Sequence, residues 1–436
     1  MTNIKKIEQY IPISEIFELF YKELDTVILE SSLVNSLGKY SIIARKPYLK
    51  IEKKNDCTLV NGVKQEVYFE TYVKNYFLEN FQKNETNLPL VAGAIGYFSY
   101  DYKRNKEDDI PESILIFYDQ FIIEEHSSKS IYVVANGKTQ KPEIAIREIE
   151  SLLSRQERKQ CQSTRLKVCY DFEREEYLKT IEKMINYIIE GDIYIANMTQ
   201  RLFLESDLEP YDLYSILRVD NPSPFAAYMN YESFQVVCAS PERFMRVKDH
   251  TIITRPIKGT RKRGSTEEED LIMKKELENS EKDKSELLMI VDLERNDLNK
   301  ICEPGSVKVD NLFSIESYAT VHHLVAEVSG MLKKETDIID IINATFPGGS
   351  ITGAPKLRAM EIIEELEHTN RGLYTGTIGY FSLNGDCDIN IVIRTAIYKD
   401  GQYSLGVGGG ITYESDIAME YEETLQKAKA FLDALR

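Results

Sequence analysis

The sequence lacks the patterns that mark several classes of protein. Its six cysteines form neither a CxxC pair nor the spacing of a zinc site, which indicates reduced thiols in a cytoplasmic protein. No apolar run is long enough to span a bilayer, and the first residues have no apolar core of signal-peptide length. We therefore expect a cytoplasmic protein with no membrane partner.

Basic residues are fewer than acidic residues. The 436 residues carry a formal net charge of −17, and the acidic residues are spread along the chain instead of forming a tail. A chain of this charge does not attract polyanions, so we expect no nucleic-acid partner.

Phosphate-binding patterns are incomplete. The segment Gly348–Lys356 (GGSITGAPK) has glycines and a lysine, but Ala-Pro separates the last glycine from the lysine, so it is not a nucleotide loop. Its backbone N–H groups at a helix start still suit an anionic oxygen. The run at 406–411 (GVGGGI) lacks a dinucleotide-binding register, and it indicates either a strand bulge or a close backbone approach to a carboxylate.

The spacing of apolar residues divides the chain into two parts. Residues 27–123 read mostly as short strands, and a charged helix follows within 141–167. We expect a boundary near Arg165, which separates an N-terminal region of residues 1–165 from a catalytic region of residues 166–436.

The second part mixes strands and helices. Helices are predicted at 175–189, 354–367 and 415–436, and Ser265 with Glu268 predicts a capping box before a further helix. The strand segments include DINIVIRTAIY and QYSLGVGGGIT. Because no βαβ rhythm repeats, the pattern indicates an α+β fold.

Acidic residues on two predicted helices form the strongest candidate site. Glu420, Glu423 and Lys427 are spaced i, i+3 and i+7, so they share one helix face, which is either a solvated ion-pair face or the wall of a cleft. Glu286 directly precedes the apolar run LLMIV. If the helices meet, Glu286, Glu423 and Glu420 could hold Mg²⁺ together with a substrate carboxylate.

Many ordered segments together resemble the chorismate-utilising family that includes anthranilate synthase, aminodeoxychorismate synthase, isochorismate synthase and salicylate synthase. The segments are GDIYIANMTQR, NPSPF, SPERF, RPIKGT, ELLMIVDLERNDL, VHHL, FPGGSITGAPKLRAMEIIEELE, RGLYTGTIGY, INIVIRTA, GGGI and EYEET. The resemblance implies large, mainly antiparallel sheets flanked by helices, as in anthranilate synthase component I, with chorismate and Mg²⁺ bound in the C-terminal part.

The resemblance also implies roles for single residues. Glu286 and Glu423 match metal ligands, with Glu420 beside them, and Glu242 matches the general acid at the C4 hydroxyl. The matches to substrate contacts and to the active-site histidine are Arg394, Tyr374, Thr352, Gly408, Gly409, Gly410, Lys427 and His323.

The segment RPIKGT separates two reactions within the family. Anthranilate synthases usually have PIAGT, whereas PIKGT resembles aminodeoxychorismate synthases, so Lys258 is the candidate nucleophile. An uncharged lysine that first occupies C2 of chorismate would direct ammonia to C4 by double displacement, giving 4-amino-4-deoxychorismate for p-aminobenzoate and folate synthesis. Ile195 replaces a residue that is usually polar in relatives and cannot activate water, which argues against hydroxylation at C2.

The expected partners follow from this reaction. The chain shows no glutaminase pattern, so a separate glutamine amidotransferase subunit would supply ammonia, and an aminodeoxychorismate lyase would act on the product. The alternatives are amination at C2, as in anthranilate synthase component I, and a non-catalytic chorismate-binding subunit.

Two further segments resemble a tryptophan pocket of relatives, although simple packing explains them equally well. They are Glu30 with Ser31, and Asn221, Pro222, Ser223, Pro224 and Phe225.

Overall fold

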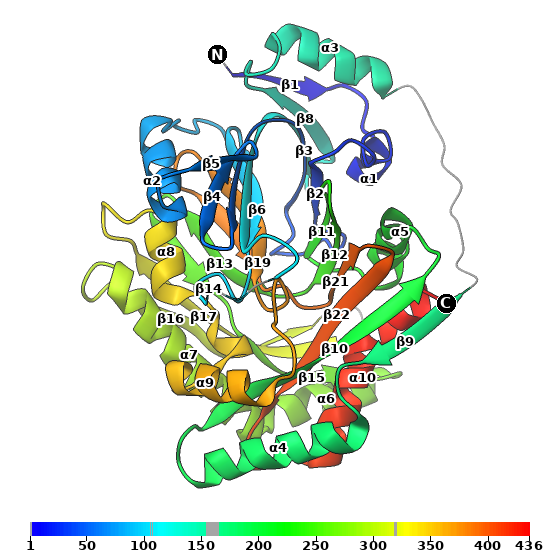
Figure 1. The fold of residues 1–436 in the computed structure, drawn as a ribbon, viewed down its shortest axis with the longest axis vertical. Coiled ribbons are helices and arrows are strands. Elements are labelled where there is room, and N and C mark those ends of the chain that lie inside the picture. The colour runs from blue at the N-terminus through cyan, green and yellow to red at the C-terminus, as the bar shows by residue number, and fades with distance from the viewer. Residues whose placement is uncertain (1, 105, 107, 154–164, 318–320) are drawn as a thin grey trace.

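Antiparallel strand pairing organises the chain in the computed structural model, which describes residues 2–104, 106, 108–153, 165–317 and 321–436 (Figure 1). One path of hydrogen-bonded neighbours runs β1 (Asn3–Ile7), β8 (Ser130–Ala135), β7 (Ser113–Glu125), β3 (Tyr40–Lys54), β2 (Thr26–Glu30), β11 (Phe225–Asn230), β12 (Gln235–Ser240), β21 (Thr395–Lys399), β22 (Gln402–Ile411), β10 (Ile195–Ser206) and β9 (Leu166–Tyr170).

A second path leaves β7 on the edge opposite β3, where β6 pairs with residues 113–117 and β8 with residues 120–125. It runs β6 (Gly93–Phe98), β19 (Thr377–Ser382), β20 (Cys387–Asn390), β13 (Arg243–Lys248), β14 (Thr251–Thr254) and β17 (Val321–Met331), which pairs with both β15 (Ile257–Lys262) and β16 (Lys308–Ser317). Short strands complete the set: β4 (Cys57–Val60), β5 (Val63–Gln65) and β18 (Gly353–Ala354). Because these pairings are antiparallel throughout, the predicted α+β class is confirmed.

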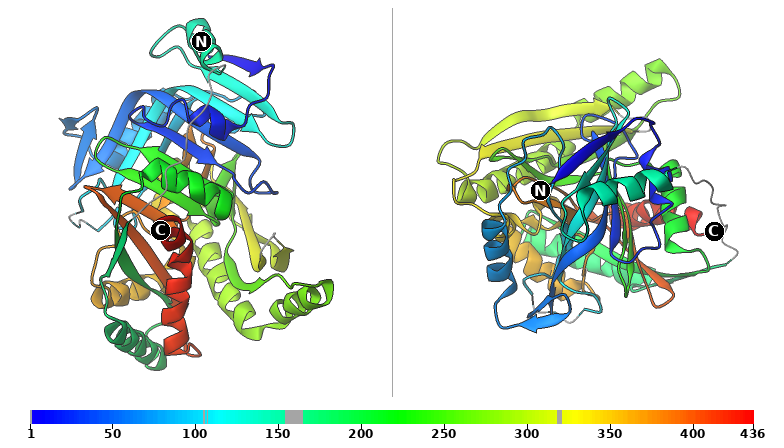
Figure 2. Two further views of the ribbon diagram at one scale, coloured as in Figure 1. Left: turned by 90° about the vertical axis from the view of Figure 1, so that its right-hand side faces the viewer. Right: turned by 90° about the horizontal axis from the view of Figure 1, so that it is seen from above.

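Helices flank the strands. They are α1 (Ile13–Phe17), α2 (Phe69–Glu79), α3 (Pro142–Leu152), α4 (Arg174–Ile189), α5 (Pro210–Asp220), α6 (Glu267–Asn279), α7 (Glu281–Ile301), α8 (Ile338–Thr345), α9 (Lys356–Leu366) and α10 (Ile417–Ala434), with the 3₁₀ turn η1 (Gly349–Ile351). The left view of Figure 2 shows α10 apart from α6 and α7. None of the described helices combines the length and apolar character needed to cross a bilayer.

Strands from the two halves of the sequence pair with each other and share a core. β2 pairs with β11, and β6 pairs with β19. Val27, Ile95, Val236 and Ile378 belong to one buried apolar cluster, so strands of both paths contribute to the same core. The boundary near Arg165 stays a prediction, and the later part of the predicted 141–167 helix falls on residues 154–164, outside the described residues.

Three local predictions differ from the structure. The structure caps α6 with Thr266, which accepts from Glu269 N, whereas the sequence predicts Ser265 with Glu268. Arg263 and Gly264 N both donate to Asp270, and these contacts hold the segment before the helix so that the helix begins one residue later. The helix predicted at 354–367 begins at Lys356, after Pro355 as its N-cap. The segment DINIVIRTAIY is two strands, since the chain turns at Arg394, whose φ is 48°.

The glycine run of β22 is a regular strand. Its register with β10 is unbroken from Ile411, opposite Ala196, to Tyr403, opposite Leu204. The bulge interpretation of residues 406–411 is therefore wrong, and the close-approach interpretation remains. The five cysteines among the described residues are free thiols, as expected, and Cys161 lies outside them.

Candidate active site

Lys258 lies near the start of β15, where the pairing register with β17 shifts between Lys258 and Thr260. Gly259 between them has a φ of 74°, a conformation that glycine adopts without steric cost. The half-buried Lys258 Nζ lies 3.5 Å from the carbonyl oxygen of Ser350, and a Cβ added to Gly410 would lie 3.5 Å from the same nitrogen. The amine therefore lies over the glycine run of β22.

Glu242 is a buried carboxyl group in the turn between β12 and β13. Burial raises the pKa of Glu242 to about 7, while the charges of Lys258 and Lys427 oppose this rise. Among the described residues, its Oε1 atom has no hydrogen-bond partner. A buried carboxyl group of this kind, close to an amine, has the properties of a general acid that is protonated near neutral pH.

The glycine run makes room for these side chains. A Cβ on Gly409 would lie 3.1 Å from Glu420 Oε2 and 3.6 Å from Glu423 Oε1. A Cβ on Gly410 would lie 3.4 Å from the buried Ile195 side chain. The backbone of β22 thus faces the acidic helix on one side and an apolar wall beside Lys258 on the other.

The predicted acidic face of α10 is turned toward β22. Lys427 Nζ donates to the carbonyl oxygen of Gly408 at 2.7 Å and pairs with Glu423 Oε1 at 2.7 Å. Ser415 Oγ donates to Glu420 Oε1 at 2.7 Å. The face contacts β22, but the Lys427–Glu423 ion pair is partly exposed, so both interpretations of this helix face stay predictions.

Glu286 of α7 lies close enough to α10 for its charge to act there. Burial raises the pKa of Glu286, and the neighbouring charge of Glu420 adds to the rise. Burial likewise raises the pKa of Glu420, with Glu423 adding to it, and Lys282 opposes the rise at both Glu286 and Glu420. Carboxylates that repel one another in this way suit a divalent cation, whose charge would offset the repulsion.

The carboxylates do not form a closed cage. The described residues contain no group of three His, Cys, Asp or Glu side chains already placed to hold a metal. Mg²⁺ commonly keeps one or two carboxylates from the protein and takes its other oxygens from water or substrate. The carboxylates of Glu286, Glu420 and Glu423 have the chemistry of such an open site, and Mg²⁺ binding there stays a prediction.

Arg394 and His323 lie near one another beside this region. Burial lowers the pKa of His323 to about 4, and the guanidinium groups of Arg394 and Arg255 add to the shift. His323 Nδ1 lies 2.8 Å from the Thr260 hydroxyl on β15. Arg394 keeps access to solvent, although surrounding protein atoms desolvate it enough to lower its pKa. At neutral pH His323 is thus an uncharged hydrogen-bonding group next to a cation.

Tyr374 and Thr352 belong to the walls of the site. Tyr374 is buried against Gly406, where a Cβ would clash with its ring at 2.3 Å. Thr352 Oγ1 donates to the carbonyl oxygen of Gly348 at 2.8 Å, so its side chain stabilises the loop that carries Ser350. Neither arrangement tests a contact with substrate, and both roles stay predictions.

The two segments of the candidate tryptophan pocket do meet. Ser31 Oγ donates to the carbonyl oxygen of Pro224 at 2.9 Å. A cavity of about 380 Å³ is lined by Glu30, Ser31, Pro224 and Phe225 among other residues. The Glu30 carboxylate is held by Arg218 at 2.6 Å and by the Tyr214 hydroxyl.

Three residues of the second segment lie outside the lining of this cavity. Asn221, Pro222 and Ser223 are not among the residues that line the cavity. Ser223 N instead donates to Ser32 Oγ at 2.9 Å, and this hydrogen bond joins the two segments outside the cavity lining. Whether tryptophan binds stays a prediction.

Sequence reasoning missed two residues of the site. Ser350 provides a carbonyl oxygen 3.5 Å from Lys258 Nζ and lies beside Glu242, but in its segment the sequence indicates only Thr352 as a site residue. Lys282 acts on both Glu286 and Glu420, and its i, i+4 spacing before Glu286 was an available signal.

Comparison with known proteins identifies the family. Residues 31–433 match the family described as chorismate binding enzyme. The chain is 37% identical to aminodeoxychorismate synthase component 1 of Bacillus subtilis (strain 168), across 94% of this chain and 91% of that protein. It is also 37% identical to anthranilate synthase component 1 of Acetivibrio thermocellus, across 91% and 87%.

A solved structure agrees with these relatives. Anthranilate synthase component I from Streptococcus pneumoniae TIGR4 superposes with a TM-score of 0.82 and 30% identity, covering 92% of this chain and 93% of that one. The chain therefore belongs to the chorismate-binding enzyme family, and its resemblance to that family is confirmed.

The glycine run offers a direct test of this site. Gly410→Ala should leave the free energy of unfolding within about 1 kcal/mol, since a strand tolerates alanine and the new Cβ meets only ordinary contacts. It should reduce chorismate consumption at least about tenfold, because the methyl group, 3.5 Å from the Lys258 amine, would occupy space beside the amine that the substrate needs. Denaturant unfolding and a steady-state assay measure the two effects.

Gly408→Ala is the matched control, because its Cβ would lie 2.4 Å from the Met198 carbonyl oxygen. It should lower the free energy of unfolding by about 1–3 kcal/mol. Full activity in Gly410→Ala would show that the glycine run does not border the reacting groups.

Proposed function

We propose that the protein aminates chorismate at C4 with ammonia and forms 4-amino-4-deoxychorismate. The observation that carries the proposal is the Lys258 amine, which lies over the glycine run of β22 within electrostatic reach of the buried carboxyl group of Glu242. The Bacillus subtilis relative, which is 37% identical across 94% of this chain and 91% of its own length, is an aminodeoxychorismate synthase component 1, which supports the same reaction.

The reaction divides between these two groups. The uncharged amine of Lys258 attacks C2, the ring double bonds shift, and the C4 oxygen leaves as water with a proton from Glu242. Ammonia then forms the bond to C4, the double bonds return, and the C2–N bond to Lys258 breaks. The proton that ammonia loses restores Glu242, so the lysine and the acid both return to their starting states.

Other residues of the site would hold the substrate. Arg394 and Tyr374, with the backbone of Gly408, Gly409 and Gly410, suit the enolpyruvyl carboxylate, and Lys427 suits the ring carboxylate. Neutral His323 provides a hydrogen bond beside Arg394. Mg²⁺, held by Glu286 and Glu423 with Glu420 beside them, would supply positive charge for the ring carboxylate.

Ile195 bears on which nucleophile reaches C2. Its side chain is buried and packs against Gly410, on the strand that Lys258 faces. No hydroxyl, amine or carboxylate stands at this position to take a proton from water, which supports an amine nucleophile.

The proposal includes partners. The relatives' name, component 1, implies a second component, and a separate glutamine amidotransferase subunit would supply ammonia to this chain. An aminodeoxychorismate lyase would convert the product to p-aminobenzoate for folate synthesis. A cytoplasmic location is consistent with these partners.

Anthranilate formation by amination at C2 is the second candidate. A second relative at 37% identity and the Streptococcus pneumoniae structure are both anthranilate synthase components. The presence of Lys258, with its amine directed into the site, favours amination at C4 over this alternative.

Product identification separates these functions. Purified protein with chorismate, Mg²⁺ and ammonium should consume chorismate and give a product that an added aminodeoxychorismate lyase converts to p-aminobenzoate. Omission of Mg²⁺ should abolish turnover. Fluorescent anthranilate as the product would contradict amination at C4, and absence of turnover would indicate a non-catalytic chorismate-binding subunit.

The pH dependence tests the role of Glu242. A general acid must carry its proton, and the pKa of Glu242 is about 7. Glu242→Gln, which donates no proton, should lower kcat about 10²–10⁴-fold. The ratio of kcat/KM of wild type to that of Glu242→Gln, at constant free ammonia, should fall about tenfold per pH unit above about pH 7, because the two proteins share every other titration, including that of the nucleophile. A ratio that stays level to pH 9 would exclude Glu242 as the acid.

A further inference from the structure

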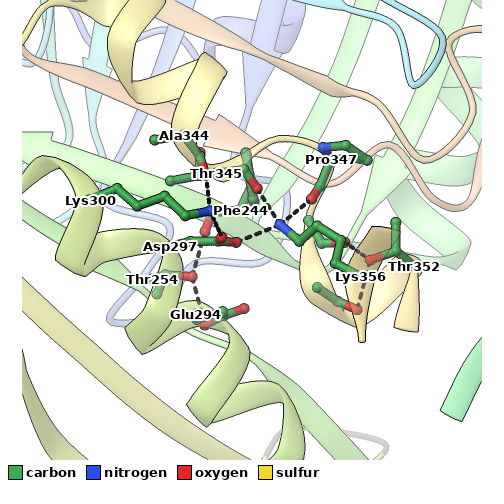
Figure 3. Close-up of polar contacts among 12 residues, drawn as sticks. Phe244, Thr254, Glu294, Asp297, Lys300, Ala344, Thr345, Pro347, Thr352 and Lys356 are labelled. Atoms are coloured by element: carbon green, nitrogen blue, oxygen red, sulfur yellow. Dashed lines mark hydrogen bonds and ion pairs between the residues drawn. The ribbon is translucent and has the colours of Figure 1, made fainter. Parts of the chain in front are cut away.

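Glu294 is a second buried carboxyl group, and the proposed reaction gives it no role (Figure 3). It lies on α7, and its Oε2 atom is 3.0 Å from the hydroxyl of Thr254 at the end of β14. The same hydroxyl is 2.9 Å from the carbonyl oxygen of Phe244, two residues after Glu242. A chain of polar contacts thus leads from Glu294 to the segment that carries the general acid.

The hydrogen positions along this series of contacts can be assigned by counting donors and acceptors. The Thr254 hydroxyl has one hydrogen, and the Phe244 carbonyl oxygen can only accept. If Thr254 donates to Phe244, then Glu294 must donate to Thr254, and it can do so only as a protonated acid. If Glu294 were ionised, two oxygens without a hydrogen between them would lie 2.9 or 3.0 Å apart in a buried place, which is unfavourable.

The surrounding charges favour the same assignment. The nearby cation, Lys356 of α9, is already bound by Asp297 at 2.5 Å and by the carbonyl oxygens of Thr345 and Pro347 at 2.8 and 2.9 Å. Figure 3 shows this lysine directed toward Asp297, apart from Glu294. Within the described part of the chain, Glu294 forms no ion pair, and Lys356 is bound by Asp297 instead.

The titratable groups that act on Glu294 are Glu242, Lys356 and Asp297. Burial raises the pKa of Glu294 to about 8, and the charges of Glu242 and Asp297 increase the rise, while the contact with Thr254 and the charge of Lys356 oppose it.

We propose that Glu294 is a protonated carboxylic acid that donates a hydrogen bond to Thr254 and so positions the segment carrying Glu242. Glu294 is a positioning residue, since it reaches the reacting atoms only through Thr254 and Phe244. Its neutral state also lets Glu242 ionise without a second negative charge beside it. The positioning role rests on the proposed function of Glu242, whereas the protonation state does not.

Unfolding measured across pH tests the protonation state without substrate. Unfolded Glu294 ionises near pH 4.5 and folded Glu294 near pH 8, so the stability that its proton contributes is present at low pH and is lost as pH rises through this window. Glu294→Gln has no proton to lose. The unfolding constant of wild type relative to Glu294→Gln should therefore increase about tenfold per pH unit from about pH 5 to 8 and then level off.

Two variants keep this test decisive. Glu294→Leu also removes the ionisable group and should show the same pH-dependent ratio, which covers the case in which the glutamine variant does not fold. Glu303→Gln, an exposed glutamate after α7, is the control and should give a ratio that does not change over this range. A constant ratio for the Glu294 variants would mean that Glu294 is ionised in the folded protein and would overturn the proposal.

Turnover tests the positioning role. The amide of Glu294→Gln can still donate to Thr254, so its kcat with chorismate, Mg²⁺ and ammonium should stay within about threefold of wild type. Glu294→Leu cannot donate, and its kcat should fall at least about tenfold with little change in KM. Equal activity of the two variants would contradict positioning through Thr254, while the unfolding result would still report the protonation state.

Discussion

The closeness of the half-buried Lys258 amine to the buried carboxyl group of Glu242 is the constraint on which the site depends. A buried carboxylate without a partner would be costly, and a buried ammonium equally so. Lys258 and Lys427 hold the pKa of Glu242 near neutrality against the effect of burial. The same closeness places an acid and a nucleophile where a single ring could contact both.

Antiparallel pairing makes this closeness possible. Glu242 comes from the turn before β13, Lys258 from β15, Glu286 from α7 and Gly410 from β22. β15 is fixed by β17, and β22 is fixed by β10 over an unbroken register. Because side chains at β22 would fill the same space, the glycine run is what leaves room between these elements. Function at this site therefore depends on backbone register as much as on the reacting groups.

Much of this arrangement could be predicted from the sequence, for identifiable reasons. The i, i+3 and i+7 spacing on α10 fixes Glu420, Glu423 and Lys427 on one helix face whatever surrounds it, and that face does contact β22. The α4 helix ends before Gly191, as its apolar spacing and glycine stop indicate. The α+β class follows from strand-like segments without a βαβ rhythm.

The rest depends on tertiary contacts that local patterns do not report. Arg394 breaks a segment of strong strand propensity, because its carbonyl oxygen is bound by Ala239 N and its φ is 48°. Glu294 appears in the sequence as one charge in a charged helix, and only the packing of Thr254 against it reveals a neutral acid. The metal site stays a prediction, since the described part of the chain holds no closed group of ligands.

The central claim is that the Lys258 amine forms a bond to the ring of the substrate. Intact-mass analysis of protein quenched during turnover tests it most directly, with Lys258→Ala as the matched control. The account predicts a covalent adduct that maps to Lys258 and is absent from Lys258→Ala, which should make little 4-amino-4-deoxychorismate. Efficient formation of that product by Lys258→Ala would contradict the account.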